Sequence, residues 1–192
     1  MITINDQSGL LTPVYFIPSP NCDERPDASD MSLLVIHGIS LPPGEFGGDA
    51  ITQLFNNALN PNDHPFFQEI FEARVSSHLL IRRDGMVIQY VPFLKRAWHA
   101  GASIFEGREK CNDYSIGIEL EGTDDSSYTE KQYKSLAKVS KVLMTRYPKI
   151  TMDRIVGHSD VAPGRKTDPG PAFDWEYYKG MLVCEEGFTK SS

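Results

Sequence analysis

The sequence predicts a mixed αβ fold, in which a central mixed β-sheet is flanked by helices and long loops gather at one end. Short apolar strand segments alternate along the chain with helical segments, an order that builds a sheet covered by helices. Residues 114–121 alternate strictly between apolar and polar side chains, which is typical of a strand. Residues 130–147 carry an apolar stripe at helical spacing, the clearest helix signal in the chain.

The other strand signals are short apolar runs bounded by turns. Leu33–Ile36 is a continuous apolar run that predicts a buried strand ending at His37. Residues 76–82 and 86–91 predict a hairpin around the Asp84-Gly85 dipeptide.

The helices are expected from their capping residues. Asp49 is expected to cap a helix with one apolar face. Thr129 and Gln132 match a capping box at the start of the long helix, and Pro148 marks its end. Asp174 is expected to cap a last helix. The apolar face of the first helix consists of Ile51, Leu54, Phe55, Ala58 and Leu59.

Length and composition indicate an ordinary globular protein. The chain has 192 residues, of which 40% are hydrophobic and 23% charged, enough apolar material for one core. We expect a single domain over residues 1–192, with residues 1–11 and 187–192 peripheral or frayed. The net charge of -7 and the absence of a basic cluster argue against a nucleic-acid partner.

The N-terminal segment and the cysteines predict a cytoplasmic protein. No Lys or Arg precedes Arg25, so the basic start of a signal peptide is missing, and no apolar run approaches the length of a membrane span. We therefore expect no membrane partner. Cys22, Cys111 and Cys184 are an odd number of widely spaced cysteines, which favours reduced thiols.

Two histidines and an aspartate form a candidate metal site. His37 ends one short apolar run, and His158 ends another at Ile155–Val156, so neighbouring strands would bring both rings to the same rim of the sheet. A single histidine at a strand end is more often structural. Asp168, ten residues after His158, completes two histidines and a carboxylate, which with one open position is a catalytic zinc pattern. We expect one zinc ion per chain.

A zinc hydrolase also needs a base and a group that holds the oxyanion. Glu119 and Glu121 share the polar face of their strand, and the alternation leaves open which one is the base and whether both are simply solvated. Lys166, two residues before Asp168, would lie beside a carbonyl held at the metal. The remaining histidines are not expected to bind metal, although His99 is expected to line a pocket with Trp98; they are His64, His78 and His99.

Four long motifs resemble the AmpD-type N-acetylmuramoyl-L-alanine amidases. They are LLVIHGISLPPGEFGG, VSSHLLIRRDGMVIQYVPFLKRAWHAG, CNDYSIGIELEGTD and GHSDVAPGRKTDPGPAFDW, and the resemblance covers roughly residues 12–182. It implies a cytoplasmic enzyme that acts on soluble 1,6-anhydro-muropeptides during cell-wall recycling. It also implies the mixed αβ fold shared with peptidoglycan recognition proteins and phage lysozyme-type amidases.

The resemblance assigns roles residue by residue. It makes Glu119, and not Glu121, the catalytic glutamate, which takes a proton from the attacking water and returns it to the leaving nitrogen of L-alanine. It makes Lys166 the catalytic lysine, which stabilises the oxyanion. The implied zinc ligands are His37, His158 and Asp168, and the implied substrate contacts are Arg74, Trp98 and Arg165. One departure from the family pattern is Gly38. The AmpD-type pattern has asparagine after the first ligand histidine, so a polar contact to the substrate is expected to be missing here.

Three alternatives compete with this interpretation. A non-catalytic peptidoglycan-binding module on the same fold would have lost a zinc ligand, and none is lost here. An autolysin or endolysin on intact wall would call for export or an added wall-binding domain, and the sequence shows neither. A different zinc hydrolase with the same ligands would not explain the long motifs.

We expect a monomer.

Overall fold

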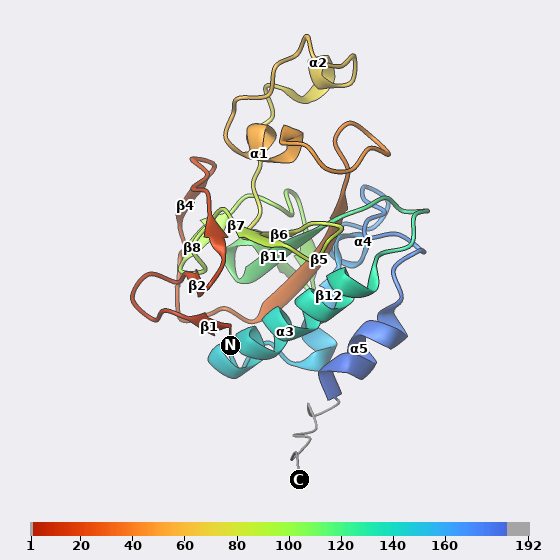
Figure 1. The fold of residues 1–192 in the computed structure, drawn as a ribbon. Helices are drawn as coiled ribbons and strands as arrows, with labels where there is room; N and C mark the ends of the chain where they lie inside the picture. The colour runs from red at the N-terminus through yellow and green to blue at the C-terminus, as the bar shows by residue number, and fades with distance from the viewer. Residues whose placement is uncertain (1, 184–192) are drawn as a thin grey trace.

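A six-stranded mixed sheet lies at the centre of the computed structural model, which describes residues 2–183 (Figure 1). Its strand order is β12-β5-β11-β6-β7-β3. The first four strands of that order run parallel, and β7 pairs antiparallel with β6 in the predicted hairpin. The predicted mixed αβ fold is therefore confirmed. The strands are β3 (Tyr15–Phe16), β5 (Leu33–Ile39), β6 (Leu79–Ile81), β7 (Val87–Gln89), β11 (Ser115–Glu121) and β12 (Ile155–Gly157).

Helices cover the sheet on opposite sides. In Figure 1, α3 (Glu130–Arg146) and α5 (Trp175–Val183) lie below the sheet, and α1 (Ala50–Phe55) and α2 (Phe67–Ile70) lie above it. The short helix α4 (His158–Val161) follows β12 directly.

Two of the three predicted caps make a side-chain hydrogen bond to the start of their helix. Thr129 accepts a hydrogen bond from the Gln132 backbone N–H, and the Gln132 side chain accepts one from the Thr129 N–H, so α3 begins with the predicted capping box. Asp174 accepts from the N–H of Tyr177 at the start of α5. Asp49 stands at the predicted cap position, directly before Ala50, but its side chain makes no cap hydrogen bond.

The first helix is also shorter than predicted. It ends at Phe55, and Ala58 and Leu59 lie beyond it. Asn57 adopts a left-handed backbone conformation with φ of 59°, which stops the helix. Leu59 is nevertheless buried in the same hydrophobic cluster as Leu54 and Phe55.

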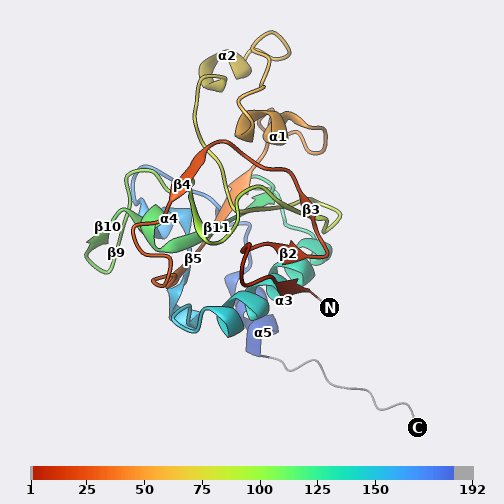
Figure 2. The ribbon, with the colours of Figure 1, turned by 90° about the vertical axis from the view of Figure 1, so that its left-hand side faces the viewer.

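Smaller hairpins and turns surround this framework. Figure 2 shows β1 and β2 beside α3, and the β9–β10 hairpin projecting on the opposite side of the view. A further pair, β4–β8, is antiparallel. These strands are β1 (Thr3–Ile4), β2 (Leu11–Thr12), β4 (Cys22–Glu24), β8 (Lys95–Ala97), β9 (Ile104–Phe105) and β10 (Arg108–Glu109), and the short turns of 3₁₀ helix are Cys111–Asp113 and Met152–Arg154.

Both faces of the sheet are buried. All seven residues of β11 are buried, including the polar set that its alternation predicted on a separate face. One face packs with α3 in the largest hydrophobic cluster, through residues such as Ile116 and Ile118. The other face holds Ser115, Gly117 and Glu119. Helices and loops cover both sides of the sheet. The alternation of apolar and polar residues in β11 therefore distinguishes two buried faces, and the polar face is not exposed to solvent.

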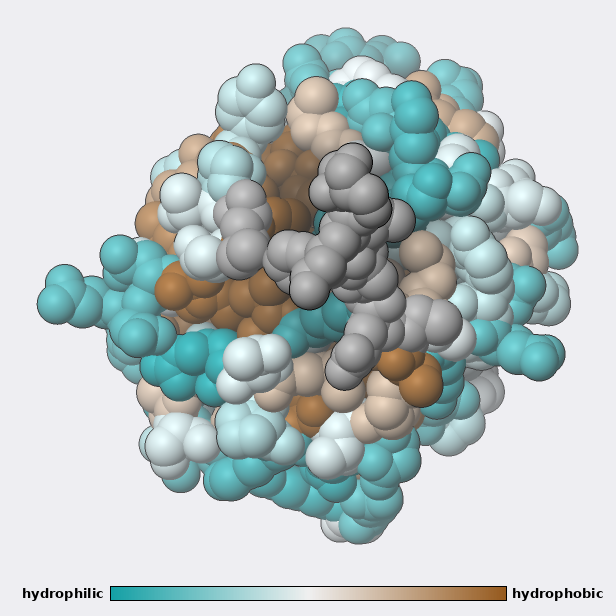
Figure 3. Space-filling model, turned by 60° about the horizontal axis from the view of Figure 1, so that its bottom comes forward, coloured by the Kyte–Doolittle hydropathy of each residue, from teal (hydrophilic) through white to brown (hydrophobic). Residues whose placement is uncertain are grey.

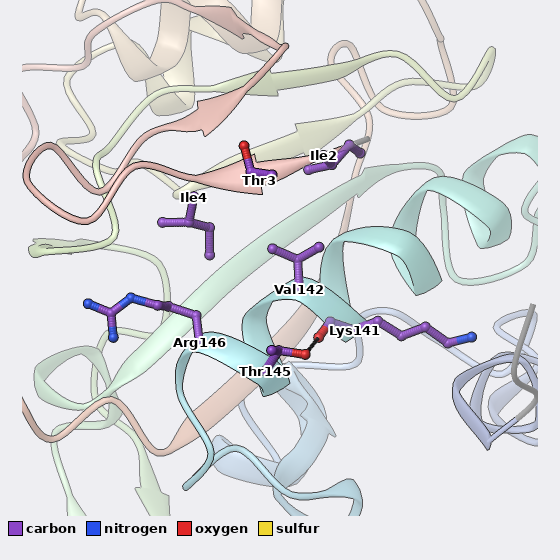
Figure 4. A pocket seen from close by; sticks show the side chains of 7 residues that line it. All are labelled: Ile2, Thr3, Ile4, Lys141, Val142, Thr145 and Arg146. Atoms are coloured by element: carbon purple, nitrogen blue, oxygen red, sulfur yellow. Dashed lines mark hydrogen bonds between the residues drawn. The ribbon is translucent and has the colours of Figure 1, made fainter.

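The outer surface includes a hollow near the N-terminus. Figure 3 shows hydrophobic side chains gathered on the underside of the molecule. A cavity of about 400 Å³ lies between the N-terminal residues and α3 (Figure 4). Ile2, Ile4 and Val142 supply its aliphatic lining.

Two further sequence predictions can be placed. Cys22 and Cys111 are free, whereas Cys184 and the tail 187–192 lie outside the described residues. Within residues 2–183, no helix has the length and apolar character that crossing a bilayer requires.

Candidate active site

The parallel pairing of β12, β5 and β11 brings the candidate chemistry together. His37 lies in β5 directly opposite Glu119 of β11, and Gly157 of β12 pairs with Ile36 on the other side of β5. His158, which follows Gly157, is therefore next to His37. The predicted neighbouring strands are confirmed, but β5 continues to Ile39, so His37 lies inside its strand and not at its end.

Three ligand atoms converge on one point. His37 Nδ1 lies 3.0 Å from His158 Nδ1 and 3.2 Å from Asp168 Oδ2, and His158 Nδ1 lies 3.1 Å from the same oxygen. Among the described residues, this is the one group of three His, Cys, Asp or Glu side chains close enough to hold a metal ion. The structure thus brings together the three residues that the sequence singled out.

The loop after α4 returns Asp168 to the sheet. The Asp168 carbonyl accepts from the N–H of Ser159, and the Pro169 carbonyl accepts from the Tyr128 hydroxyl, over 3.0 Å each. A Cβ on Gly170 would overlap the backbone of Asp124, so the loop needs glycine there to pack this closely. These contacts hold the carboxylate beside the two imidazoles.

The electrostatics of the group favour a cation between its members. Burial lowers the pKa of His37 to about 4, so the ring is neutral near pH 7 and offers a lone pair. Burial raises the pKa of Asp168, but its hydrogen bonds to His158 and His37 outweigh burial and keep that pKa below its usual value. A carboxylate and two imidazole nitrogens at this spacing are a donor set for a metal ion.

The two glutamates have different surroundings. Glu119 is 9% exposed, its Oε1 lies 3.9 Å from His37 Nδ1, and its Oε2 has no hydrogen-bond partner. Glu121 is 2% exposed, and its two carboxylate oxygens accept from the backbone N–H groups of Gly47 and Arg83. Glu121 therefore joins two loops, while Glu119 keeps a free oxygen at the candidate metal site. The alternative of two solvated carboxylates is wrong, because both are buried.

A cavity of about 190 Å³ opens above the three ligands. Trp98, Glu119 and Lys166 line it, as the predicted roles require. Its other lining residues are His37, Gly38, Ile39, Phe55, Val75, Ser76, His99, His158 and Asp168.

Two predicted substrate residues do not line this cavity. Arg74 is exposed and donates to the carbonyl of Glu72. Arg165 is also exposed and donates to the carbonyls of Ala100 and Ala102, which holds the loop beside the site. The structure thus places both arginines outside the cavity wall.

Sequence reasoning assigned no role at the metal site to His99, which the structure places against a ligand. His99 Nδ1 lies 2.9 Å from His37 Nε2. Nothing local in its motif signals this contact, since the two residues are 62 positions apart and meet only through the fold.

Comparison with known proteins places these features in a family. The sequence profile of the N-acetylmuramoyl-L-alanine amidases matches residues 27–171. The 1,6-anhydro-N-acetylmuramyl-L-alanine amidase AmpD of Salmonella typhimurium (strain SL1344) is 58% identical over 175 residues, which are 91% of this chain and 93% of that protein.

Solved structures agree. A crystal structure of a selenomethionine derivative of AmpD has a TM-score of 0.90 and 55% identity, covering 94% of this chain and 99% of that one. The N-acetylmuramyl-L-alanine amidase AmiD from E. coli, in complex with the substrate anhydro-N-acetylmuramic acid-L-Ala-D-gamma-Glu-L-Lys, has a TM-score of 0.57 and 27% identity. That match covers 94% of this chain and 65% of the other.

Proposed function

The chain belongs to the N-acetylmuramoyl-L-alanine amidase family, and we propose that it is a zinc-dependent amidase that acts on 1,6-anhydro-muropeptides. The bond cut is the amide between the lactyl group of anhydro-N-acetylmuramic acid and L-alanine. Hydrolysis releases the sugar with a free lactyl carboxylate and the peptide with a free L-alanine amine. The role is the recycling of cell-wall fragments.

One observation carries the proposal: the three converging ligand atoms lie in a cavity that Glu119 and Lys166 also line. Zinc suits this donor set. Tetrahedral bonds of about 2.0–2.1 Å require ligand atoms roughly 3.3 Å apart, close to the 3.0, 3.1 and 3.2 Å separations here. When bound, zinc supplies a Lewis acid that polarises the amide carbonyl and lowers the pKa of water. We propose one ion per chain, held by His37, His158 and Asp168.

Glu119 is the proposed general base and acid. Burial first, and the charge of Asp168 second, raise the pKa of Glu119 well above its usual value, while the charge of Lys166 opposes them. A carboxylate with a raised pKa takes a proton from the attacking water more readily and can then deliver it to the leaving nitrogen. Its unpartnered Oε2 is free for that exchange.

Lys166 is the proposed oxyanion stabiliser. Its charge acts on Glu119 and its side chain lines the same cavity, so an ammonium is available where negative charge develops on the carbonyl oxygen. The lysine backbone is held by a hydrogen bond from its N–H to the carbonyl of Ala162. A fixed backbone limits the positions that the ammonium group can reach.

Trp98 is the proposed platform for the sugar. Its indole N–H donates to Asp23 and its backbone N–H donates to Ser76, so the ring is held in the cavity wall. Arg74 and Arg165 stay proposed substrate contacts for parts of the muropeptide that extend past the cavity. A cytoplasmic location, a monomeric state and a single domain also stay predictions from the sequence.

Mass spectrometry of products from a defined anhydro-muropeptide tests the proposal. We expect release of the peptide with a free L-alanine amine, loss of that release after chelation, and recovery when zinc is added back. Metal analysis should find one zinc per chain. Full turnover by a verified metal-free sample would refute the zinc proposal, and binding without any product would favour a non-catalytic module.

A further inference from the structure

A chain of three buried side chains runs from the candidate metal site into the sheet. His37 Nε2 lies 2.9 Å from His99 Nδ1, and His99 Nε2 lies 3.1 Å from the hydroxyl of Ser115. The rings of His37 and His99 meet edge to face at an interplanar angle of 87°. All three residues are 9% exposed or less. His99 therefore meets His37 through one ring nitrogen and Ser115 through the other, away from solvent.

The positions of the protons follow from what a metal ligand requires. A ring nitrogen binds metal through its lone pair, so His37 Nδ1 must be unprotonated and the proton of the neutral ring must lie on Nε2. That N–H can donate only if His99 Nδ1 accepts. His99 must then carry its own proton on Nε2, where the Ser115 oxygen accepts it.

The strand next to His37 is built around His99. A Cβ on Gly117 would lie 2.5 Å from Cγ of the His99 ring, so only glycine leaves room for this ring against β11. The backbone N–H groups of His99 and Ala100 both donate to the side chain of Asn112. The imidazole packs closely against β11 and its backbone is held by Asn112, which limits the directions that its Nδ1 can take.

The same short segment supports the second histidine ligand. His158 Nε2 lies 3.3 Å from the carbonyl oxygen of Ala100, which can only accept. A proton on Nε2 leaves the Nδ1 of His158 free, on the side of Asp168. Residues 99 and 100 thus face the outer nitrogen of both histidines, one through a side chain and the other through a carbonyl.

We propose that His99, oriented by Ser115, is a positioning residue that fixes the ring orientation and metal-binding tautomer of His37. It acts on the metal through the Nε2 of His37, which its Nδ1 faces. The inference rests on the proposed metal site. Outer partners of this kind typically change metal affinity by about 10–100-fold when removed.

The test compares two substitutions of nearly equal shape in the full-length protein. His99→Leu removes the acceptor, whereas His99→Asn keeps a side-chain oxygen close to the position of Nδ1. Zinc affinity is measured by competition with a chelator, with thermal unfolding to verify the fold. We expect His99→Leu to bind zinc about 10–100-fold more weakly and His99→Asn to remain close to the unsubstituted protein. Equal affinity of a folded His99→Leu variant would overturn the proposal.

A spectroscopic measurement keeps the proposal testable if His99→Leu does not fold. Two-bond ¹H–¹⁵N correlation spectra report the tautomer of each of the five histidines in the zinc-loaded protein. We expect His37 and His99 both to carry their proton on Nε2, and Ser115→Ala to weaken that preference at His99. A proton on Nδ1 of His99 would contradict the proposed hydrogen bonds from His37 to His99 and from His99 to Ser115, even with zinc bound. If the unsubstituted chain bound no zinc, the proposed function itself would fail, which is a distinct outcome.

Discussion

The hydroxyl of Tyr128 occupies the space that a Cβ atom on Gly38 would need. From there it donates a hydrogen bond of 3.0 Å to the carbonyl of Pro169, the residue after the proposed ligand Asp168. The tyrosine ring also lies against Gly122, where a Cβ would again overlap it. Strand alternation directs position 38 to the face opposite His37. A side chain at position 38 would therefore meet Tyr128 first, and not the ligand side of the sheet where a substrate contact was expected.

Gly38→Asn is expected to displace the Tyr128 hydroxyl and break its bond to Pro169. The loss of one buried hydrogen bond should lower the free energy of unfolding by about 1–3 kcal/mol. Tyr128→Phe should lose the same bond, so the double variant should lose less than the sum of the two. Chemical denaturation of the four proteins measures this coupling. Strict additivity would mean that the two residues act independently.

A second glycine offers a control for that cycle. Gly180 lies in α5, and among residues 2–183 no side chain, and no backbone from outside the helix, lies within 4 Å of the place where its Cβ would be, its two chain neighbours aside. Gly180→Ala is expected to stabilise the protein by about 0.5–1 kcal/mol, because alanine favours the helix. Its effect should be the same with Tyr128 or with Phe at position 128.

Glu119→Gln is expected to lower kcat by about 10²–10⁴ while zinc content stays unchanged. The amide cannot accept the proton of the attacking water. Glu121→Gln is expected to affect stability more than rate, since each oxygen of Glu121 accepts from a backbone N–H and the amide nitrogen cannot. Steady-state kinetics with metal analysis separate the two. A larger rate loss for Glu121→Gln would reassign the base.

In metal-free protein at neutral pH, the same Glu119→Gln change is expected to increase stability. The raised pKa means that the folded state favours the neutral carboxyl, so stability is lost as pH rises from the unfolded value of 4.5 to the folded pKa. The gain should appear as pH rises from the unfolded value of 4.5 through the folded pKa, and it should vanish below 4.5. Thermal unfolding of both proteins across this range checks it. A gain that is independent of pH would point to packing.

Lys166→Ala is expected to lower kcat more than it raises KM, because the ammonium stabilises charge that develops only in the transition state. Lys134→Ala removes an exposed lysine of α3, on the other side of the sheet, and should leave both constants unchanged. Initial rates over a range of substrate concentrations distinguish the two effects. A normal kcat with a raised KM would make Lys166 a substrate anchor.

Soluble anhydro-muropeptides are expected to be cut much faster than intact wall. The cavity is small, about 190 Å³, and Trp98 offers a flat apolar surface that suits a compact bicyclic end group. A sugar that continues into a glycan chain would be excluded by its size. Matched peptides on anhydro and reducing muramic acid, together with purified sacculi, provide the comparison. Equal kcat/KM for both sugars would favour an autolysin.

Local signals in the sequence determined much of this protein. The apolar run before His37, the capping box at Thr129 and the hairpin at Asp84-Gly85 each depend on neighbours within a few residues, and the structure contains all three features. The ligand set could be proposed for a similar reason. Histidines near the carboxyl ends of neighbouring parallel strands lie close together at one edge of the sheet, and Asp168 is only ten residues from His158.

Only the tertiary structure decided what lies beside those residues. Alternation could not separate Glu119 from Glu121, because the two share a face of β11. They differ in their partners, since the backbone N–H groups of Gly47 and Arg83 bond to Glu121. The contact of His99 with His37 joins positions 62 apart. Burial on both faces of β11 likewise comes from segments distant in sequence. Such contacts arise from strand pairing and loop packing over long separations, which a local pattern of side chains does not encode.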